Sequence, residues 1–453
     1  MTTSAERSAN EVAEKATSRL ARLALRGGMF AIAGRGAAEV LRFGSNLLLT
    51  RLLTPEAFGL MAIAHSVSAG ARMMTDLGVR GSVVQNPRGD DPVFLNTAWT
   101  IQIIRGAGVA AALLLGAGLL ASAFDKPDAT PIIRAIAICA LIEGFMSTAG
   151  FSLLRRVRLG RQTLRDLSAK ATAIAVMVTW ALISPSVWAL VAGAITGSVM
   201  QVALSHRLIP GYRNRFAYER SASRSIVHFG RWVLIATLMT FLLKEGDRLA
   251  LGKLFSANDL GVYAIAVGLT QAIPEVLQLL SLNVLFPVYA RLGSLELGEQ
   301  RREIERYRFF ILAVALPGLW ALAWLGPYLV SFLYDARYEN AGVMVRLLAA
   351  SLIPVVVSST AERALMARGD SFSHMLLQTS QAAFVVLGML LGFAVWGGAR
   401  GVLFGLVIGR WLGYLPLAFL LQRIGLWLPR LDLLALAASA LAIGAIFALG
   451  GAP

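Results

Sequence analysis

Runs of about twenty apolar residues recur along this 453-residue chain from residue 28 to the C-terminus, and they constrain its fold more than any other feature. A helix of about 20 residues crosses about 30 Å of hydrocarbon, so each run is long enough to span a membrane. The composition agrees, since 57% of the residues are hydrophobic and 15% are charged. Soluble domains contain about 45–50% and about 25%, respectively. The chain is therefore predicted to be an all-α polytopic membrane protein.

Hydropathy places twelve spans and one further apolar segment along the chain. The spans are predicted at residues 28–50, 57–80, 95–122, 131–153, 167–185, 187–208, 226–247, 261–290, 308–334, 342–366, 375–396 and 401–421. We expect the thirteenth segment, 432–451, to form an extra helix. The predicted units are an N-terminal tail or interfacial helix (1–27), an N-lobe of six spans (28–225), a C-lobe of six spans (226–425) and an extra C-terminal transmembrane helix (426–453).

The net charge of +16 is explained mostly by orientation in the bilayer. Lys and Arg number 25 in the N-terminal tail and the alternate loops on the same side, against 6 in the loops on the other side. By the positive-inside rule, the N-terminus and the basic loops are predicted to be cytoplasmic, in a cell inner membrane. This reading makes a nucleic-acid partner unnecessary. Eleven basic residues remain within or at the edges of spans, and they carry the functional information.

An internal repeat relates the two predicted lobes. The segment that starts Arg51-Leu-Leu-Thr-Pro-Glu-Ala-Phe-Gly aligns without gaps on Lys253-Leu-Phe-Ser-Ala-Asn-Asp-Leu-Gly, at an offset of 202 residues. Both copies occupy the end of the first span of a lobe, a short outer loop and the start of the next span. Transporters are commonly built from such duplicated halves. We predict two six-helix lobes related by a two-fold axis normal to the membrane, with a cavity between them.

The same motifs carry a family resemblance. The first is Arg51-Leu-Leu-Thr-Pro-Glu-Ala-Phe-Gly-Leu60, followed by Asp76-Leu-Gly78 and Val83-Val-Gln85. The second is Asp247-Arg-Leu-Ala-Leu-Gly-Lys253, followed by Leu260-Gly-Val-Tyr263 and Leu285-Phe-Pro-Val-Tyr289. Here the chain resembles the Wzx-like oligosaccharide and polysaccharide flippases, which belong to the MOP superfamily together with MATE multidrug exporters and lipid II flippases. The resemblance covers residues from about 28 to about 425.

The resemblance implies a carrier, not an enzyme, that moves a polyprenyl-pyrophosphate-linked oligosaccharide to the periplasmic leaflet by alternating access. The pathway would be exopolysaccharide, capsule or O-antigen biosynthesis. Membrane lipids, a coupling ion such as H⁺ or Na⁺, and polymerase or export components are the implied partners. No cofactor is expected. Cys139 is the single cysteine and the four histidines are dispersed, so the sequence predicts no metal site.

Charged residues inside spans are the candidates for the substrate site, because a charge near the bilayer centre costs at least about 2.5–3.5 kcal/mol unless it meets a partner or water. Arg35, Glu39 and Arg42 follow one helical face, and Arg72 and Asp76 are spaced to pair. Guanidinium groups suit phosphate oxygens because they donate in a planar fork. We predict that the cavity is lined by the basic residues Arg35, Arg42, Arg72, Lys244 and Arg346.

Two carboxylates, Glu39 and Asp76, are the candidates for a coupling-ion site because each lies within a span. Three alternatives stay open at the level of sequence. A drug or cation antiporter of the same fold should have a cavity richer in carboxylates than in arginines. A lipid II flippase would share the cationic cavity but usually has fourteen spans. A membrane-embedded glycosyltransferase would need an acidic catalytic motif and a large outer loop, and the outer loops here are short.

Overall fold

The computed structural model describes residues 33–155, 160–209, 212–281, 285, 288–289, 292, 295–367 and 370–449, so the predicted tail at 1–27 lies outside the described residues. Regular structure in the described residues is helical, as predicted. The helices are 33–52, α2 (Pro55–Met74), α3 (Val79–Gln85), α4 (Pro92–Ala123), α5 (Ala129–Gly144), α6 (Ala149–Arg155), α7 (Gly160–Ile183), α8 (Val187–Ser205), α9 (Arg220–Leu254), α10 (Ala257–Thr270), α11 (Ala272–Leu280), α13 (Leu297–Leu333), η2 (Ala336–Tyr338), α14 (Ala341–Ala361), α15 (Arg363–Ala367), α16 (Ser371–Trp396), α17 (Gly398–Leu412), α18 (Tyr414–Arg423) and α19 (Pro429–Leu449).

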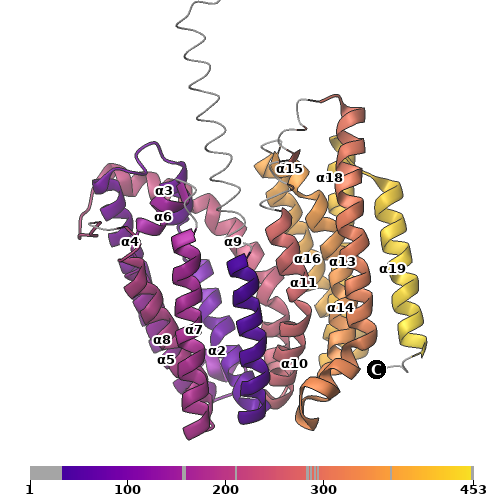
Figure 1. The fold of residues 1–453 in the computed structure, drawn as a ribbon, viewed down its shortest axis with the longest axis horizontal. Coiled ribbons are helices and arrows are strands. Elements are labelled where there is room, and N and C mark those ends of the chain that lie inside the picture. Colours follow the sequence, from indigo (N-terminus) through magenta and orange to yellow (C-terminus); the bar gives the residue numbers. More distant parts are fainter. Residues whose placement is uncertain are drawn as a thin grey trace, which may run out of the picture.

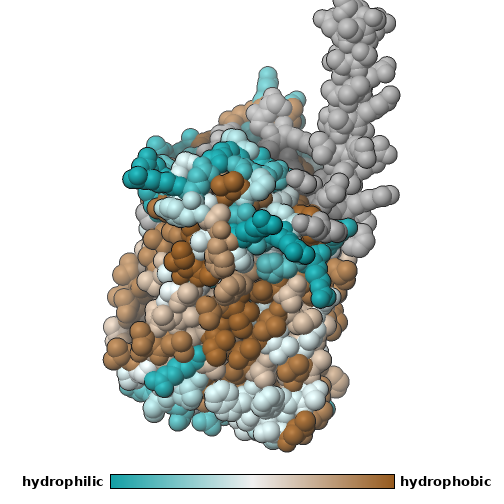
Figure 2. Space-filling view, turned by 90° about the vertical axis from the view of Figure 1, so that its left-hand side faces the viewer, coloured by the Kyte–Doolittle hydropathy of each residue, from teal (hydrophilic) through white to brown (hydrophobic). Residues whose placement is uncertain are grey.

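Within the described residues, eight helices are long and apolar enough to cross a membrane, and ten segments qualify if each bent helix pair counts as one span. The pairs are α5 with α6, bent by 62°, and α10 with α11, bent by 43°. The eight include α19, so the segment predicted at 432–451 is a helix of membrane-spanning length. Figure 2 shows an apolar band at mid-height on one face, below a hydrophilic end. The protein is a multi-pass membrane protein.

Three predicted spans, 28–50, 57–80 and 226–247, fall on helices that do not meet this criterion. They correspond to the helix 33–52, α2 and α9, in which charged or polar residues interrupt the apolar sequence. In the structure α2 packs against α5, α9 and α10, while α9 packs against α2 and α16. Protein therefore replaces lipid around much of these helices, and this is the environment in which intramembrane charges are tolerated.

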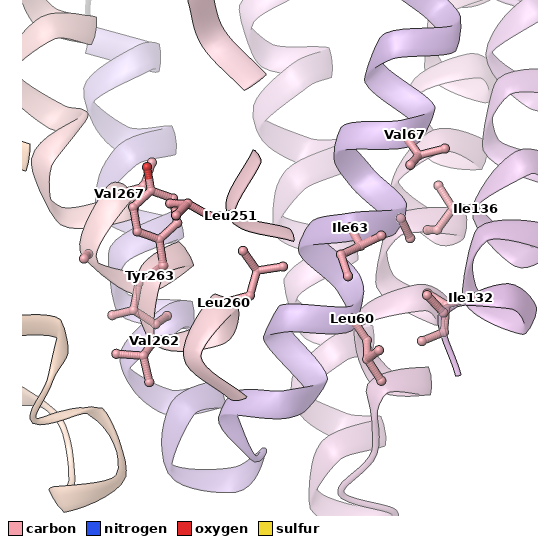
Figure 3. Close-up of a cluster of buried hydrophobic side chains, with 14 of the residues drawn as sticks. Leu60, Ile63, Val67, Ile132, Ile136, Leu251, Leu260, Val262, Tyr263 and Val267 are labelled. Atoms are coloured by element: carbon pink, nitrogen blue, oxygen red, sulfur yellow. The ribbon is translucent and has the colours of Figure 1, made fainter. Parts of the chain in front are cut away.

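The helices gather into two groups, with α9 in contact with both (Figure 1). The N-terminal group consists of the helix 33–52, which packs against α7 and α8, and α2 to α8, and the C-terminal group consists of α10 to α19. We name the end that carries α3, α6 and α15 the basic end, because loop arginines such as Arg88 and Arg215 lie there. Towards the opposite end, one apolar core joins both groups. Figure 3 shows part of it, with Leu60 of α2, Ile132 of α5 and Leu260 of α10. The separate cores at the basic end leave the groups less connected there.

The closest helix crossing between the groups obeys the sequence repeat. A Cβ added at Gly59 of α2 would lie 1.8 Å from the carbonyl oxygen of Ala257, and one added at Gly261 of α10 would lie 1.8 Å from that of Pro55. The repeat offset of 202 pairs Gly59 with Gly261 and Pro55 with Ala257. The contact is thus reciprocal, as a two-fold axis through the crossing requires. This agrees with the predicted relation between the two halves.

Two polar contacts close the opposite end on either side of that crossing. Lys253 Nζ lies 2.5 Å from Asp125 Oδ2, which links the end of α9 to the loop between α4 and α5. This ion pair lowers the pKa of the Asp125 carboxyl. Arg337 Nη2 donates to the carbonyl of Thr50 at 3.1 Å, which links the loop before α14 to the helix 33–52. Both contacts, here called the two latches, join the end of the first helix of one half to the loop between the third and fourth predicted spans of the other half.

The connection between the halves, residues 212–219, is fixed to the first helix group. Its backbone N–H groups donate to polar side chains of α4, with the pairs Arg215 to Asn96, Ala217 to Thr100 and Glu219 to Thr97. The Arg88 guanidinium donates to both carboxylate oxygens of Glu219, at 2.8 and 2.7 Å. These hydrogen bonds lower the pKa of Glu219 to about 2. The first turns of α9 accordingly pack in the N-terminal group, ahead of the predicted boundary at residue 226.

A buried ion pair fastens α19 to the second helix group. Arg308 of α13 and Asp432 of α19 are 1% and 0% exposed, and Arg308 Nη2 lies 2.5 Å from Asp432 Oδ1. Tyr414 donates to the same carboxylate at 2.7 Å, and Arg308 also donates to Thr360 Oγ1 and the carbonyl of Val357 near the end of α14. Arg308 stands at the start of the predicted span 308–334, and its side chain points into the helix group.

We expect the substitution Gly59→Ala to destabilise the protein by about 1–3 kcal/mol, because the added methyl group forces α2 and α10 apart. The measurement is thermal unfolding of the detergent-solubilised protein. The control is Gly108→Ala on α4, where an added Cβ meets nothing within 4 Å. Equal unfolding temperatures for the two variants would contradict the role of the crossing.

Asp432→Asn should destabilise the protein by about 3–5 kcal/mol, because it leaves the buried Arg308 guanidinium without its counter-charge. Replacing both partners, as Arg308→Met with Asp432→Leu, should recover most of that loss, since no buried charge then remains. Thermal unfolding of both variants measures the effect. A double variant no more stable than the single one would show that the ion pair is not the source of the stability.

Candidate functional site

A cavity of about 740 Å³ lies inside the N-terminal helix group. Its walls come from the helix 33–52, α2, α5, α6, α7 and α8. Along α7 it extends from Gln162 at the basic end to Met177, a rise of about 20 Å at 1.5 Å per residue. The cavity thus reaches from the basic end deep into the membrane-spanning part of the group.

The charges on the cavity wall are mostly basic. The cations are Arg35, Arg72, Arg80, Arg165 and Lys170, and the carboxylates are Glu143 and Asp166. Gln162, Gln201, Ser147 and Ser198 add neutral hydrogen-bonding groups. This combination suits an anionic ligand that also carries hydroxyl groups, because guanidinium and ammonium groups donate to phosphate or carboxylate oxygens, and amides and hydroxyls donate and accept.

The predicted triplet on the first helix does share one face. Arg42 Nη2 lies 2.6 Å from Glu39 Oε2, and Arg35 Nε lies 3.6 Å from Glu39 Oε1. Arg35 also reaches the C-terminal helix group, where its Nη2 lies 3.2 Å from Glu275 Oε2. Of the triplet, Arg35 lines the cavity, and Glu39 and Arg42 form the ion pair beside it. Glu39 therefore lies between two guanidinium groups.

Arg72 lines the cavity, but its predicted pairing with Asp76 was wrong. The helix α2 ends at Met74, so Asp76 leaves the helical face on which an i, i+4 pair would form. Instead Arg72 Nη1 lies 3.4 Å from Glu143 Oε2, and Asp76 accepts from Arg105 Nη1 at 3.1 Å. The Arg72–Glu143 pair separates the main cavity from a second one of about 160 Å³, which Arg105 also lines.

The structure places two other predicted cavity residues elsewhere. Lys244 is exposed on α9, and neither of the two cavities includes it. Arg346 is buried in the C-terminal group, where Nε donates to the carbonyl of Ala323 at 3.4 Å and the guanidinium lies over the ring of Phe447 on α19. Arg346 belongs to the packing between α13, α14 and α19.

Three cavity cations, Arg80, Arg165 and Lys170, were missed in the sequence reading. Arg165 was assigned to a basic loop, yet it is 8% exposed and lines the cavity. Lys170 was not singled out among the charges within spans. A usable signal was the run of polar or small residues along one face of α7 at helical spacing, namely Gln162, Asp166, Ala169, Ala173 and Met177. That face is the one that lines the cavity.

Comparisons with known proteins assign the chain to a family. The sequence profile of a family described as polysaccharide biosynthesis protein matches residues 48–343. The chain belongs to this family. The match includes both repeat motifs and confirms the resemblance inferred from them.

Two curated relatives share this similarity. The chain is 20% identical over 309 residues to the lipopolysaccharide biosynthesis protein WzxC of Escherichia coli (strain K12), covering 66% of this chain and 61% of WzxC. It is 21% identical over 294 residues to the succinoglycan biosynthesis transport protein ExoT of Rhizobium meliloti (strain 1021), covering 62% of this chain and 57% of ExoT. The aligned part is thus less than two thirds of either relative.

Among solved structures, the lipid II flippase MurJ in an inward closed conformation has a similar fold. The TM-score is 0.69 at 12% sequence identity, and the match covers 94% of this chain and 93% of MurJ. At this identity the likeness concerns the fold alone. It extends over both helix groups and so covers more of the chain than the sequence matches do.

In this family member the cavity is bordered by a broken helix. The span made of α5 and α6 bends by 62° after Gly144, which frees backbone carbonyls. Gln102 Nε2 on α4 donates to the carbonyls of Gly144 at 3.1 Å and Met146 at 3.0 Å, and Trp99 Nε1 donates to that of Phe145 at 3.3 Å. Broken helices at membrane depth need such partners, because lipid offers no hydrogen bonds.

Among the described residues, no group of three or more His, Cys, Asp or Glu side chains is placed to hold a metal ion.

Gln102→Leu should destabilise the protein by about 1–3 kcal/mol, since two carbonyls at the break lose their donor inside the protein. Thermal unfolding in detergent measures the change. The control is Gln422→Leu, which makes the same replacement on an exposed side chain at the end of α18. Equal stability of the two variants would show that the break does not depend on Gln102.

Proposed function

We propose that the protein is a carrier, not an enzyme, that moves a polyprenyl-diphosphate-linked oligosaccharide across the inner membrane by alternating access. The observation that carries the proposal is the deep cavity with five basic side chains, which include Arg35, Arg72 and Lys170. Its amide and hydroxyl groups suit sugar hydroxyls. The family and the names of its relatives support a role in polysaccharide biosynthesis and transport.

The orientation follows from the same proposal. The N-terminus and the basic end face the cytoplasm, where the lipid-linked sugar is assembled, so the apolar core and the two latches close the periplasmic side. The described arrangement is then the one that receives substrate. The diphosphate lies among the cavity cations, and the polyprenyl chain stays in the lipid. Polymerisation and export fall to other proteins, and coupling to H⁺ or Na⁺ through Glu39 or Asp76 stays a prediction.

The test is deletion of the gene followed by extraction of lipids and complementation with variants. Deletion should cause polyprenyl-linked oligosaccharide to accumulate in the cytoplasmic leaflet, and the wild-type gene should clear it. Arg72→Gln should lower transport about 10- to 100-fold, because one charge-assisted contact to phosphate is worth about 1.5–3 kcal/mol.

The matched control is Arg302→Gln, the same change on an exposed side chain at the basic end of α13, which should transport normally. A deletion strain without the accumulated intermediate would refute the proposal. Accumulation of lipid II instead would assign the chain to the lipid II flippases, and a gain in drug sensitivity alone would favour an exporter.

A further inference from the structure

An ion pair crosses between the two helix groups at the edge of the cavity. Arg35 belongs to the first helix and lines the cavity, while Glu275 lies in the first turn of α11 in the other group. Arg35 Nη2 lies 3.2 Å from Glu275 Oε2. The Arg35 side chain is 51% exposed and that of Glu275 is 28% exposed, so a ligand in the cavity can reach the pair.

The surrounding charges make Glu275 a competitor for any anion that enters. Arg42 is held by Glu39 at 2.6 Å, and Lys170 of α7, which also lines the cavity, lies within electrostatic range of Glu39 and Glu275. The cluster consists of the cations Arg35, Arg42 and Lys170 and the carboxylates Glu39 and Glu275. Its net formal charge is +1. Without Glu275 the four N-terminal members carry +2, which matches the two charges of a diphosphate diester. Glu275, the carboxylate from the second helix group, therefore lowers the net charge of the cluster below the +2 that would balance a diphosphate diester.

We infer that Glu275 is a resident counter-ion that holds Arg35 in the empty carrier and is displaced by the anionic group of the substrate. The inference rests on the proposed function, since it assigns the competing ligand to the same cavity. Like charges repel at short range, so a bound diphosphate and the Glu275 carboxylate exclude each other from Arg35. Substrate binding thus exchanges a contact between the helix groups for a contact with the ligand.

The position of Glu275 links this exchange to movement. It follows Pro274 at the 43° bend between α10 and α11, where the proline has no backbone N–H to donate. The N-terminal part of α10 is fixed at the Gly59–Gly261 crossing. Release of Arg35 therefore removes this contact between α11 and the helix 33–52, while α10 stays in place. In this way occupancy of the site controls how firmly the two groups are joined near the basic end.

The experiment measures binding of farnesyl diphosphate to the full chain in lipid nanodiscs by titration calorimetry. Glu275→Gln should bind it about 3- to 10-fold more tightly than wild type, because the competing charge is gone. Glu305→Gln, the same change on an exposed residue of α13, and Glu275→Asp, which keeps the charge, should bind like wild type. Farnesol, which lacks the charge, should not distinguish the variants.

A second readout reports the link between the helix groups. Spin labels at Leu164 of α7 and Phe372 of α16, both exposed near the basic end, are placed in a Cys139→Ser background. In wild type, farnesyl diphosphate should shift the distance distribution between the labels. In Glu275→Gln the shifted distribution should already be present without ligand, and ligand should add little. A variant that merely unfolds would show neither tighter binding nor this distribution.

The outcomes separate the two proposals. Binding by wild type that depends on Arg35, with unchanged affinity and distances in Glu275→Gln, would overturn the counter-ion inference and leave the proposed function standing. Failure of the wild-type protein to bind farnesyl diphosphate would overturn both. Tighter binding by Glu275→Gln together with the shifted distances is the result that supports the inference.

Discussion

The close crossing of α2 and α10 is the contact on which the arrangement of the two halves depends. Glycine is needed at both positions, Gly59 and Gly261, because each backbone occupies the space that the other's Cβ would fill. The crossing brings α2 and α10 together and allows the apolar core to continue from one helix group into the other. A continuous apolar core towards one end and a cavity that reaches the other are both compatible with that single point of approach.

The cost of burying charge explains where the rest of the polar chemistry lies. Cations within the helices occur in both groups, for example Arg72 on α2, Lys170 on α7 and Arg308 on α13. Several of the cavity cations have a carboxylate within ion-pair distance, such as Glu143 beside Arg72 and Glu275 beside Arg35. Paired charges can remain in place when no ligand is bound. When an anion enters, a cavity cation can exchange its carboxylate partner for the anion. A cavity without charged groups could not make this exchange.

Sequence reasoning predicted what depends on periodicity and failed where long-range contacts decide. Hydropathy gave the helices and the repeat gave the relation between the halves, because both are local patterns. The pairing of Arg72 with Asp76 assumed that α2 continues, whereas Gly78 adopts a positive φ of 59° and the chain turns away. Arg346 was predicted to line the cavity because it is a charged residue within a span. Its actual partners, on α13 and α19, are not neighbours in the sequence and could not be predicted from it. No spacing rule predicts which neighbour a buried arginine meets.

The buried pair between Arg308 and Asp432 has a consequence for how the protein is made. The two residues are 124 positions apart, so the arginine enters the membrane long before its counter-charge is synthesised. Until α19 arrives, a nascent chain must hold an unmatched guanidinium beside α14 or keep α13 near the surface. Assembly of the second half therefore depends on α19, and chains that lack it carry an exposed polar defect. Such a defect is the kind of mark by which membrane quality control distinguishes unfinished chains from finished ones.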